Sequence, residues 1–122
     1  ILSMEGRHNK NIGDWGEEKA TEFLRRHGFE VVDRKFSTTF GEIDIVACKS
    51  GDYYFVEVKT RLDFELANNS AITYSKLQKL LKSIRIYAYK KKLEDVALIP
   101  AALVIYVDKV KKTAKFMFNV IN

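Results

Sequence analysis

The first helical pattern of apolar and polar positions in the chain predicts a helix over residues 13–28. Its predicted buried face consists of Ala20, Phe23, Leu24 and His27. Gly28 is a natural helix end. Asp14, followed three residues later by Glu17, is typical of a capping box at the helix start.

A second and stronger helical pattern covers residues 73–92. Its apolar stripe comprises Leu77, Leu80, Leu81, Ile84 and Ala88. Ser75 and Gln78 have the spacing of a second capping box. The pattern therefore predicts a long helix that packs against the rest of the protein.

Runs rich in valine and aromatic residues predict strands over residues 29–36, 42–48 and 53–59, and residues 49–52 have turn chemistry. Pro100 is expected to break the chain before an apolar strand over 101–107. After a turn, a last strand places Phe116, Phe118 and Val120 on one face, whereas residues 60–72 look like an irregular loop. The order αβββαββ predicts an α/β (α+β) fold, in which helices flank a central mixed β-sheet.

The composition favours one compact domain, because the chain of 122 residues is 47% hydrophobic and has one proline. We assign residues 13–122 to a single domain and residues 1–12 to an N-terminal extension that could be disordered. We expect no membrane association, since the apolar runs are too short and the start lacks a secretory signal. A single cysteine, Cys48, excludes an internal disulfide and fits a cytoplasmic protein.

Charge is distributed unevenly along the chain, although the net charge is only +5. Residues 1–65 contain ten basic and thirteen acidic side chains, whereas residues 66–122 contain eleven basic and three acidic ones. An acidic half beside a basic half suits a protein that binds both a metal ion and a polyanion. A solvated lysine-rich surface explains the same distribution.

The predicted hairpin brings two carboxylates together. With the turn centred on residues 50–51, the facing pairs are Cys48–Tyr53, Asp44–Glu57 and Glu42–Lys59. A hard divalent cation would relieve the repulsion between Asp44 and Glu57, and Mg²⁺ commonly binds one or two carboxylates. The alternative is that both carboxylates lie on the solvated face of an amphipathic hairpin.

Glu17 and Lys59 are two further candidates for this site. Glu17 lies at the edge of the apolar face of the first helix, where it could complete a metal site or serve only as the capping partner of Asp14. Lys59 follows Glu57 by two residues, so both project from one face. It could orient a nucleophilic water and stabilise developing charge on a phosphate, or it could form an ion pair with Glu42.

Two segments of the chain resemble the core motif of the PD-(D/E)xK nuclease superfamily: GEIDIV at 41–46 and FVEVKTR at 55–61. With GDWGEEKA at 13–20, the chain resembles the bacterial YraN-like family, UPF0102, which is itself similar to archaeal Holliday-junction resolvases. The resemblance covers about residues 13–82 and implies a restriction-endonuclease-like fold. Two departures stand out: Ile43 replaces the proline of the motif name, and residues 62–72 lack the usual glycine and proline.

By this resemblance, Glu17, Asp44 and Glu57 would be acidic residues of the metal site. The backbone carbonyl of Val58 would be a further ligand, and Lys59 would be the catalytic lysine. The cofactor implied is Mg²⁺, for which Mn²⁺ can substitute.

Lys76, Lys79 and Lys82 lie on the side of the second predicted helix opposite its leucine stripe, as Lys90 does. With Arg61 and Gln78 they are candidates for contacts to nucleic-acid phosphates, although a solvated helix face would look similar. The pattern carries no signal for the reading of bases.

We therefore expect a metal-dependent DNA endonuclease that selects branched or nicked duplex DNA. Two other classes remain open. The first is a DNA- or RNA-binding module without catalysis, and the second is a subunit that recruits a partner nuclease through residues 60–72. A homodimer is also compatible with the resemblance, since resolvase-like nucleases are often symmetric dimers.

Overall fold

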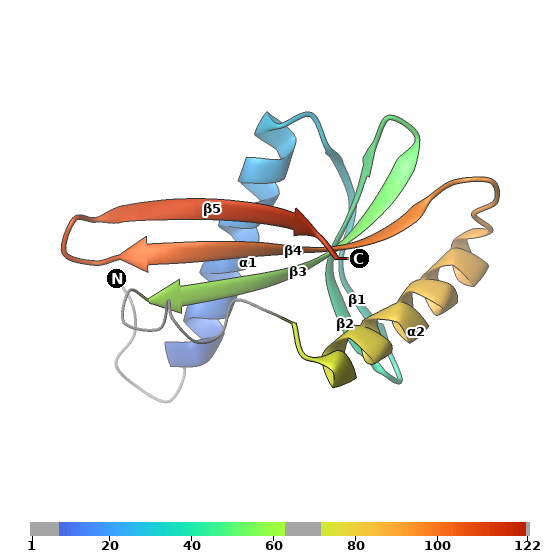
Figure 1. The fold of residues 1–122 in the computed structure, drawn as a ribbon, viewed down its shortest axis with the longest axis horizontal. Helices are drawn as coiled ribbons and strands as arrows, with labels where there is room; N and C mark the ends of the chain where they lie inside the picture. Colours follow the sequence, from blue (N-terminus) through green and yellow to red (C-terminus); the bar gives the residue numbers. More distant parts are fainter. Residues whose placement is uncertain (1–7, 63–71, 122) are drawn as a thin grey trace.

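The computed structural model describes residues 8–62 and 72–121, which form two helices and one β-sheet (Figure 1). The elements are α1 (His8–Arg26), β1 (Glu30–Thr38), β2 (Gly41–Lys49), β3 (Asp52–Leu62), α2 (Tyr74–Lys91), β4 (Leu98–Asp108) and β5 (Thr113–Val120). The predicted order αβββαββ is therefore confirmed.

The sheet has five strands in the order β1-β2-β3-β4-β5. Neighbouring strands are antiparallel except β3 and β4, which run parallel because α2 carries the chain back between them. The sheet is thus mixed, as predicted. At the β2–β3 turn, Ser50 and Gly51 have φ angles of 53° and 85°, the pair of positive values that a tight hairpin of this kind requires.

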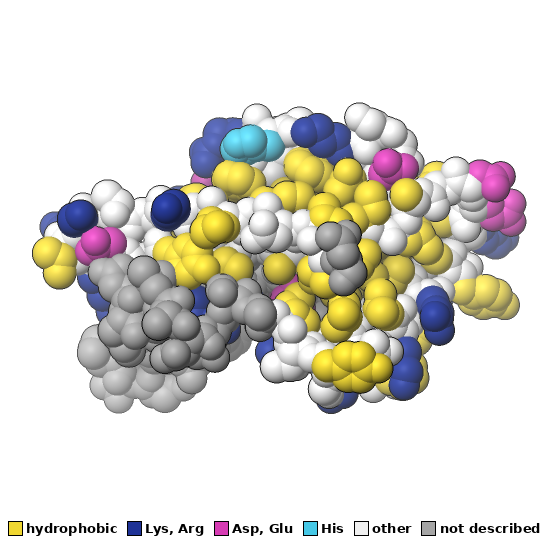
Figure 2. Space-filling view, viewed as in Figure 1, with side chains coloured by type: hydrophobic (Ala, Val, Ile, Leu, Met, Phe, Trp, Pro, Cys, Tyr) yellow, Lys and Arg dark blue, Asp and Glu magenta, His cyan; other side chains and the backbone are white. Residues whose placement is uncertain are grey.

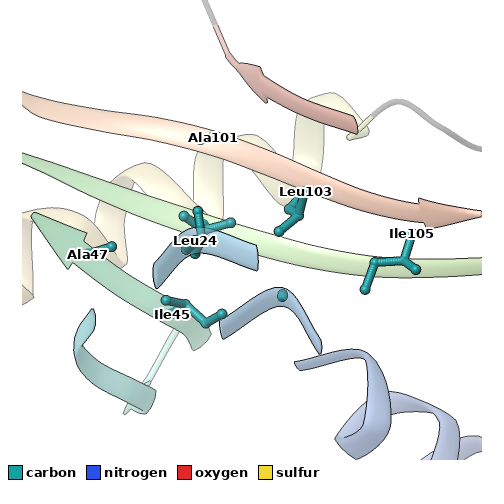
Figure 3. Close-up of a cluster of buried hydrophobic side chains, with 8 residues drawn as sticks. Leu24, Ile45, Ala47, Ala101, Leu103 and Ile105 are labelled. Atoms are coloured by element: carbon teal, nitrogen blue, oxygen red, sulfur yellow. The ribbon is translucent and has the colours of Figure 1, made fainter. Parts of the chain in front are cut away.

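The central strands supply two separate hydrophobic clusters, one on each face of the sheet. The two-residue alternation is interrupted in β2, where Ile43 and Ile45 belong to different clusters. On the α1 face, Leu24 belongs to one cluster with Ile45, Leu103 and Ile105 (Figure 3). On the α2 face, the cluster comprises Ile43, Val46, Phe55, Leu80, Ile84 and Tyr87. The two helices therefore cover opposite faces, with α1 behind the sheet in the view of Figure 1.

Both predicted capping boxes are wrong. Helix α1 begins at His8, so Asp14 lies inside the helix, where its carboxylate accepts a hydrogen bond from Lys35 Nζ at 3.1 Å. Thr73, rather than Ser75, caps α2: its side chain accepts from the Lys76 backbone N–H at 3.2 Å.

Three smaller differences concern boundaries and exposure. Pro100 does not precede β4 but lies within it, ahead of the first residue that pairs with β5. Residues 60–62, predicted as loop, continue β3, and the rest of that predicted loop up to residue 71 lies outside the described residues. His27 is exposed rather than buried and stacks on Phe23, with 4.1 Å between ring centroids.

Gly16 allows α1 to approach β3 closely. A Cβ atom at this position would collide with Thr60 Oγ1, whereas a Cβ atom at Gly13, three residues earlier in the same helix, would meet nothing within 4 Å. Gly16→Ala is therefore expected to destabilise the protein by about 1–2 kcal/mol, because overpacking exceeds the gain in helix propensity. Gly13→Ala should stabilise it by about 0.5–1 kcal/mol. Urea unfolding of both variants checks this, and equal effects at the two positions would contradict the close approach.

Candidate functional site

The ladder between β2 and β3 ends next to Asp44. Its regular pairs run from Lys49–Asp52 to Ile45–Val56 with the predicted offset. Beyond them, the Val58 backbone N–H donates to Asp44 Oδ2 at 2.8 Å, so that a carboxylate takes the place of a strand carbonyl. The predicted pair Cys48–Tyr53 is confirmed, whereas Asp44–Glu57 and Glu42–Lys59 are not partners in the ladder.

Asp44 is a largely buried carboxylate whose negative charge is opposed by three other acidic side chains. Burial raises the pKa of Asp44 from 3.8 to about 7. The Val58 N–H opposes this rise by stabilising the carboxylate, while the charges of Glu57, Glu17 and Glu42 add to it. A cation bound here would offset these effects by stabilising the charged carboxylate.

Glu57 and Lys59 project from the same face of β3, because they are two residues apart on the strand. Burial raises the pKa of Glu57, while Lys76 and Lys59 lower it. Burial, and then the charge of Lys76, lowers the pKa of Lys59, whereas Glu57 and Asp44 raise it. Lys59 is only 8% exposed, and the charges of Glu57 and Asp44 act on its ammonium group.

The predicted alternative for Lys59, an ion pair with Glu42, does not form among the described residues. Glu42 pairs instead with Ser37 on β1, and Ser37 Oγ donates to Glu42 Oε2 at 3.5 Å.

Glu17 is buried at 5% exposure, and its carboxylate is held by two cations from β1. Arg34 Nε donates to Glu17 Oε2 at 2.8 Å, and Lys35 Nζ lies 3.5 Å from Glu17 Oε1. Glu17 still acts on Asp44 through its charge, as the raised pKa of Asp44 shows. It is therefore a neighbour of the site that already has partners, and it does not cap α1.

In residues 8–62 and 72–121, no three His, Cys, Asp or Glu side chains are grouped closely enough to hold a metal ion. Glu17 therefore does not join Asp44 and Glu57 in one cluster. Two carboxylates are nevertheless a common protein contribution to Mg²⁺ sites, in which waters and substrate phosphate complete the shell. Carboxylate oxygens such as those of Asp44 and Glu57, and a backbone carbonyl such as that of Val58, are of the chemical type that Mg²⁺ and Mn²⁺ bind.

The lysines predicted on the second helix lie on α2 beside this site. Lys76 and Lys79 line a cleft of about 210 Å³ together with Glu57. Lys82 lies next to them, with its Nζ 5.0 Å from the centroid of the Phe40 ring. Figure 2 shows Lys and Arg side chains along the outer side of α2, around a more hydrophobic surface toward the middle of the face.

Two predicted nucleic-acid contacts lie apart from that cleft. Arg61 is half-buried near the end of β3, where its Nη1 donates to the Thr60 carbonyl at 3.1 Å. Gln78 is half-buried on α2 and does not line the cleft that contains Glu57. The structure thus brings together Asp44, Glu57, Lys59, Lys76 and Lys79. Arg61 acts on Lys59 through its charge but does not line the cleft, and Gln78 does neither.

Sequence reasoning missed Arg34 and Lys35, the partners of Glu17. Consecutive strand residues normally point to opposite faces, but β1 contains an irregularity between Val31 and Asp33, and Lys35 has a positive φ of 53°. The run of charged residues in an otherwise apolar strand was the available signal. Phe40, in the turn before Gly41, was also missed.

A five-stranded mixed sheet with an Asp–Glu pair and a buried lysine beside the end of a strand ladder defines a small α/β domain with a candidate metal site. The family model described as "Uncharacterised protein family UPF0102" matches residues 16–121. The chain therefore belongs to the UPF0102 family, as its motifs predicted.

Several relatives carry the same family name. The chain is 51% identical over 75 residues to a UPF0102 protein of Helicobacter pylori strain HPAG1, covering 62% of this chain and 64% of the relative. It is 47% identical over 81 residues to a UPF0102 protein of Sulfurimonas denitrificans, covering 66% of this chain and 73% of the relative. The chain thus matches slightly less than two thirds of the length of the Helicobacter protein. In the described part of the chain, neither helix is long and apolar enough to cross a membrane.

Proposed function

We propose that this domain is a metal-dependent endonuclease that hydrolyses DNA phosphodiester bonds and selects branched or nicked duplexes. The observation that carries the proposal is the position of Asp44, which accepts from the Val58 N–H beside the end of the β2–β3 ladder. The charge of Glu57 acts to raise the pKa of Asp44, and the charges of both carboxylates act to raise the pKa of the buried Lys59. The resemblance of residues 41–46 and 55–61 to the PD-(D/E)xK motif supports the same chemistry.

Each residue of the site has a role in this proposal. Asp44, Glu57 and the Val58 carbonyl would hold Mg²⁺, or Mn²⁺ in its place. When bound, the ion would supply positive charge to the scissile phosphate and lower the pKa of a coordinated water. Lys59 would orient the attacking water and donate to the phosphate oxygens as negative charge develops. Glu17 would act only through its charge, because Arg34 and Lys35 hold its carboxylate.

The test is incubation of the purified protein with a panel of linear, nicked, flapped and four-way DNA substrates of one sequence. Cleavage is expected with Mg²⁺ or Mn²⁺ and not with a chelator, and faster on branched or nicked substrates than on the linear duplex. If no substrate is cut under any metal condition, the proposed activity is wrong.

A DNA- or RNA-binding module without catalysis is the second candidate, favoured by Lys76 and Lys79, which line the cleft beside Glu57. Such a module would bind nucleic acid with a strong salt dependence and would not cut it. A homodimer, a cytoplasmic location and recruitment of a partner through residues 60–72 stay predictions.

Both candidates require the lysines of α2 to contact phosphates. Each such contact contributes a slope of about −0.9 to log K against log salt concentration on duplex DNA. The triple variant Lys76→Ala, Lys79→Ala and Lys82→Ala should therefore weaken binding about equally across sequences and flatten that slope. Fluorescence anisotropy at several salt concentrations measures this, with Lys111→Ala in the β4–β5 turn as the control. An unchanged slope would assign the lysines to a solvated helix face.

A further inference from the structure

The turn between β1 and β2 presents an aromatic ring to solvent. Thr39 and Phe40 connect the two strands, and the Phe40 side chain is 41% exposed. Tight turns normally contain glycine, asparagine, aspartate, proline or serine, because these residues suit the backbone and remain solvated. A large apolar ring at this position contributes little to the core and is available for contact with a ligand.

Hydrogen bonds of the Thr38 side chain fix the turn and connect it to α2. Thr38 Oγ1 accepts from the Phe40 backbone N–H at 3.0 Å and donates to the Gly41 carbonyl at 3.0 Å. It also lies 2.7 Å from Ser83 Oγ, whose residue is 2% exposed on the buried face of α2. The backbone that carries Phe40 is therefore fixed relative to α2 before any ligand arrives.

A cleft of about 210 Å³ separates this turn from α2, with Phe40, Glu42, Glu57, Lys76 and Lys79 among its lining residues. One wall is aromatic and α2 contributes two lysines, while Glu42 and Glu57 contribute two carboxylates. Lys82 Nζ, 5.0 Å from the Phe40 ring centroid, adds a cation next to the aromatic wall. Glu57 lines this cleft and is also one of the two candidate metal-binding carboxylates. A ligand in the cleft would therefore lie beside the site of the proposed chemistry.

We propose that this cleft binds one unpaired DNA nucleotide, with its base stacked on Phe40 and its phosphates against Lys79 and Lys82. The inference rests on the proposed function, because it names the part of a DNA substrate that lies next to the scissile phosphate. Stacking on an aromatic side chain together with lysine contacts to the backbone is the usual way in which proteins bind single strands without reading sequence. A base inside an intact duplex has no free face to stack, whereas a branch, flap or frayed nick offers one.

The experiment compares binding of a labelled ten-nucleotide oligo-dT with binding of a duplex of the same length, by fluorescence anisotropy in the presence of a chelator. Phe40→Ala should weaken binding of oligo-dT about tenfold and leave duplex binding unchanged, since stacking of one base contributes on that order. Phe40→Trp should retain the affinity, and oligo-dT should quench the fluorescence of this variant more than that of the wild type. Tyr89→Ala is the matched control, because Tyr89 is an 87% exposed aromatic on α2 that does not line the cleft.

Equal affinities of Phe40→Ala and Tyr89→Ala for oligo-dT would overturn the inference. Further outcomes distinguish a failure of this inference from a failure of the proposed function. If the wild type cuts no DNA but binds oligo-dT through Phe40, the binding site stands and the chemistry is wrong. If the wild type cuts DNA and Phe40→Ala keeps the full preference for branched substrates, the activity stands and the role of Phe40 is wrong.

Discussion

Lys59→Ala is expected to lower the rate of DNA cleavage at saturating metal by about a hundredfold or more, the usual effect of removing one preorganised electrostatic group. Asp44→Asn and Glu57→Gln should each lower it at least as much, because each removes a metal-binding oxyanion. The three residues act as a unit, so combining two of the changes should add little to either alone. Single-turnover cleavage of the best substrate from the DNA panel measures all of these rates.

Two exposed residues provide controls of matched chemistry. Glu94→Gln removes a carboxylate and Lys111→Ala removes an ammonium group, both at exposed positions outside the helices and strands. Both should cleave at nearly the wild-type rate. Wild-type cleavage by a folded Asp44→Asn protein would show that the active site lies elsewhere.

Without metal, Asp44 should make the folded protein less stable as the pH rises from about 4 to about 7. The folded-state pKa of Asp44 is about 7 against an ordinary value of 3.8, so the native state binds more protons than the unfolded state in this range. The stability lost over the whole range corresponds to about 4 kcal/mol for a shift of this size, as an upper bound. The raised pKa of Glu57 acts in the same direction.

Urea unfolding of wild type and Asp44→Asn at pH 4 and pH 8, with a chelator, isolates the contribution of Asp44. The variant should be clearly more stable than the wild type at pH 8 and close to it at pH 4. The asparagine oxygen can still accept from the Val58 N–H, so that hydrogen bond is not lost. A stability difference that is the same at both pH values would contradict the burial of a charged carboxylate here.

The hairpin around Ser50–Gly51 shows how much of the strand register can be predicted from the sequence. Turn chemistry and the two-residue period of strands predicted the correct offset for five residue pairs. The same rule failed beyond Ile45–Val56, because the Asp44 side chain takes the Val58 N–H that a continued ladder would use. Burial of Asp44, rather than direct pairing with Glu57, is the larger cause of its raised pKa. Periodicity identifies which face a residue occupies, but it does not reveal where a side chain replaces the backbone.

The helices show a different limit. The apolar stripes placed both helices and predicted burial of Ala20, Leu24, Leu80 and Ile84. Local capping signals misplaced the start of α1, because Asp14 contacts Lys35 from β1 instead of the helix backbone. The ion pairs of Glu17 likewise join residues that are far apart in the sequence. Such partners depend on how the elements pack, which a single sequence does not show.

Calorimetric titration of Mn²⁺ into metal-free wild type, Asp44→Asn and Glu57→Gln at pH 8 tests the shared metal site most directly. Wild type should bind Mn²⁺ saturably, and each variant should bind it at least about tenfold more weakly, a loss of about 1.4 kcal/mol. Glu94→Gln should bind as wild type does. Equal affinity of Asp44→Asn and wild type for Mn²⁺, or no saturable binding by the wild type, would contradict a metal site built on Asp44 and Glu57.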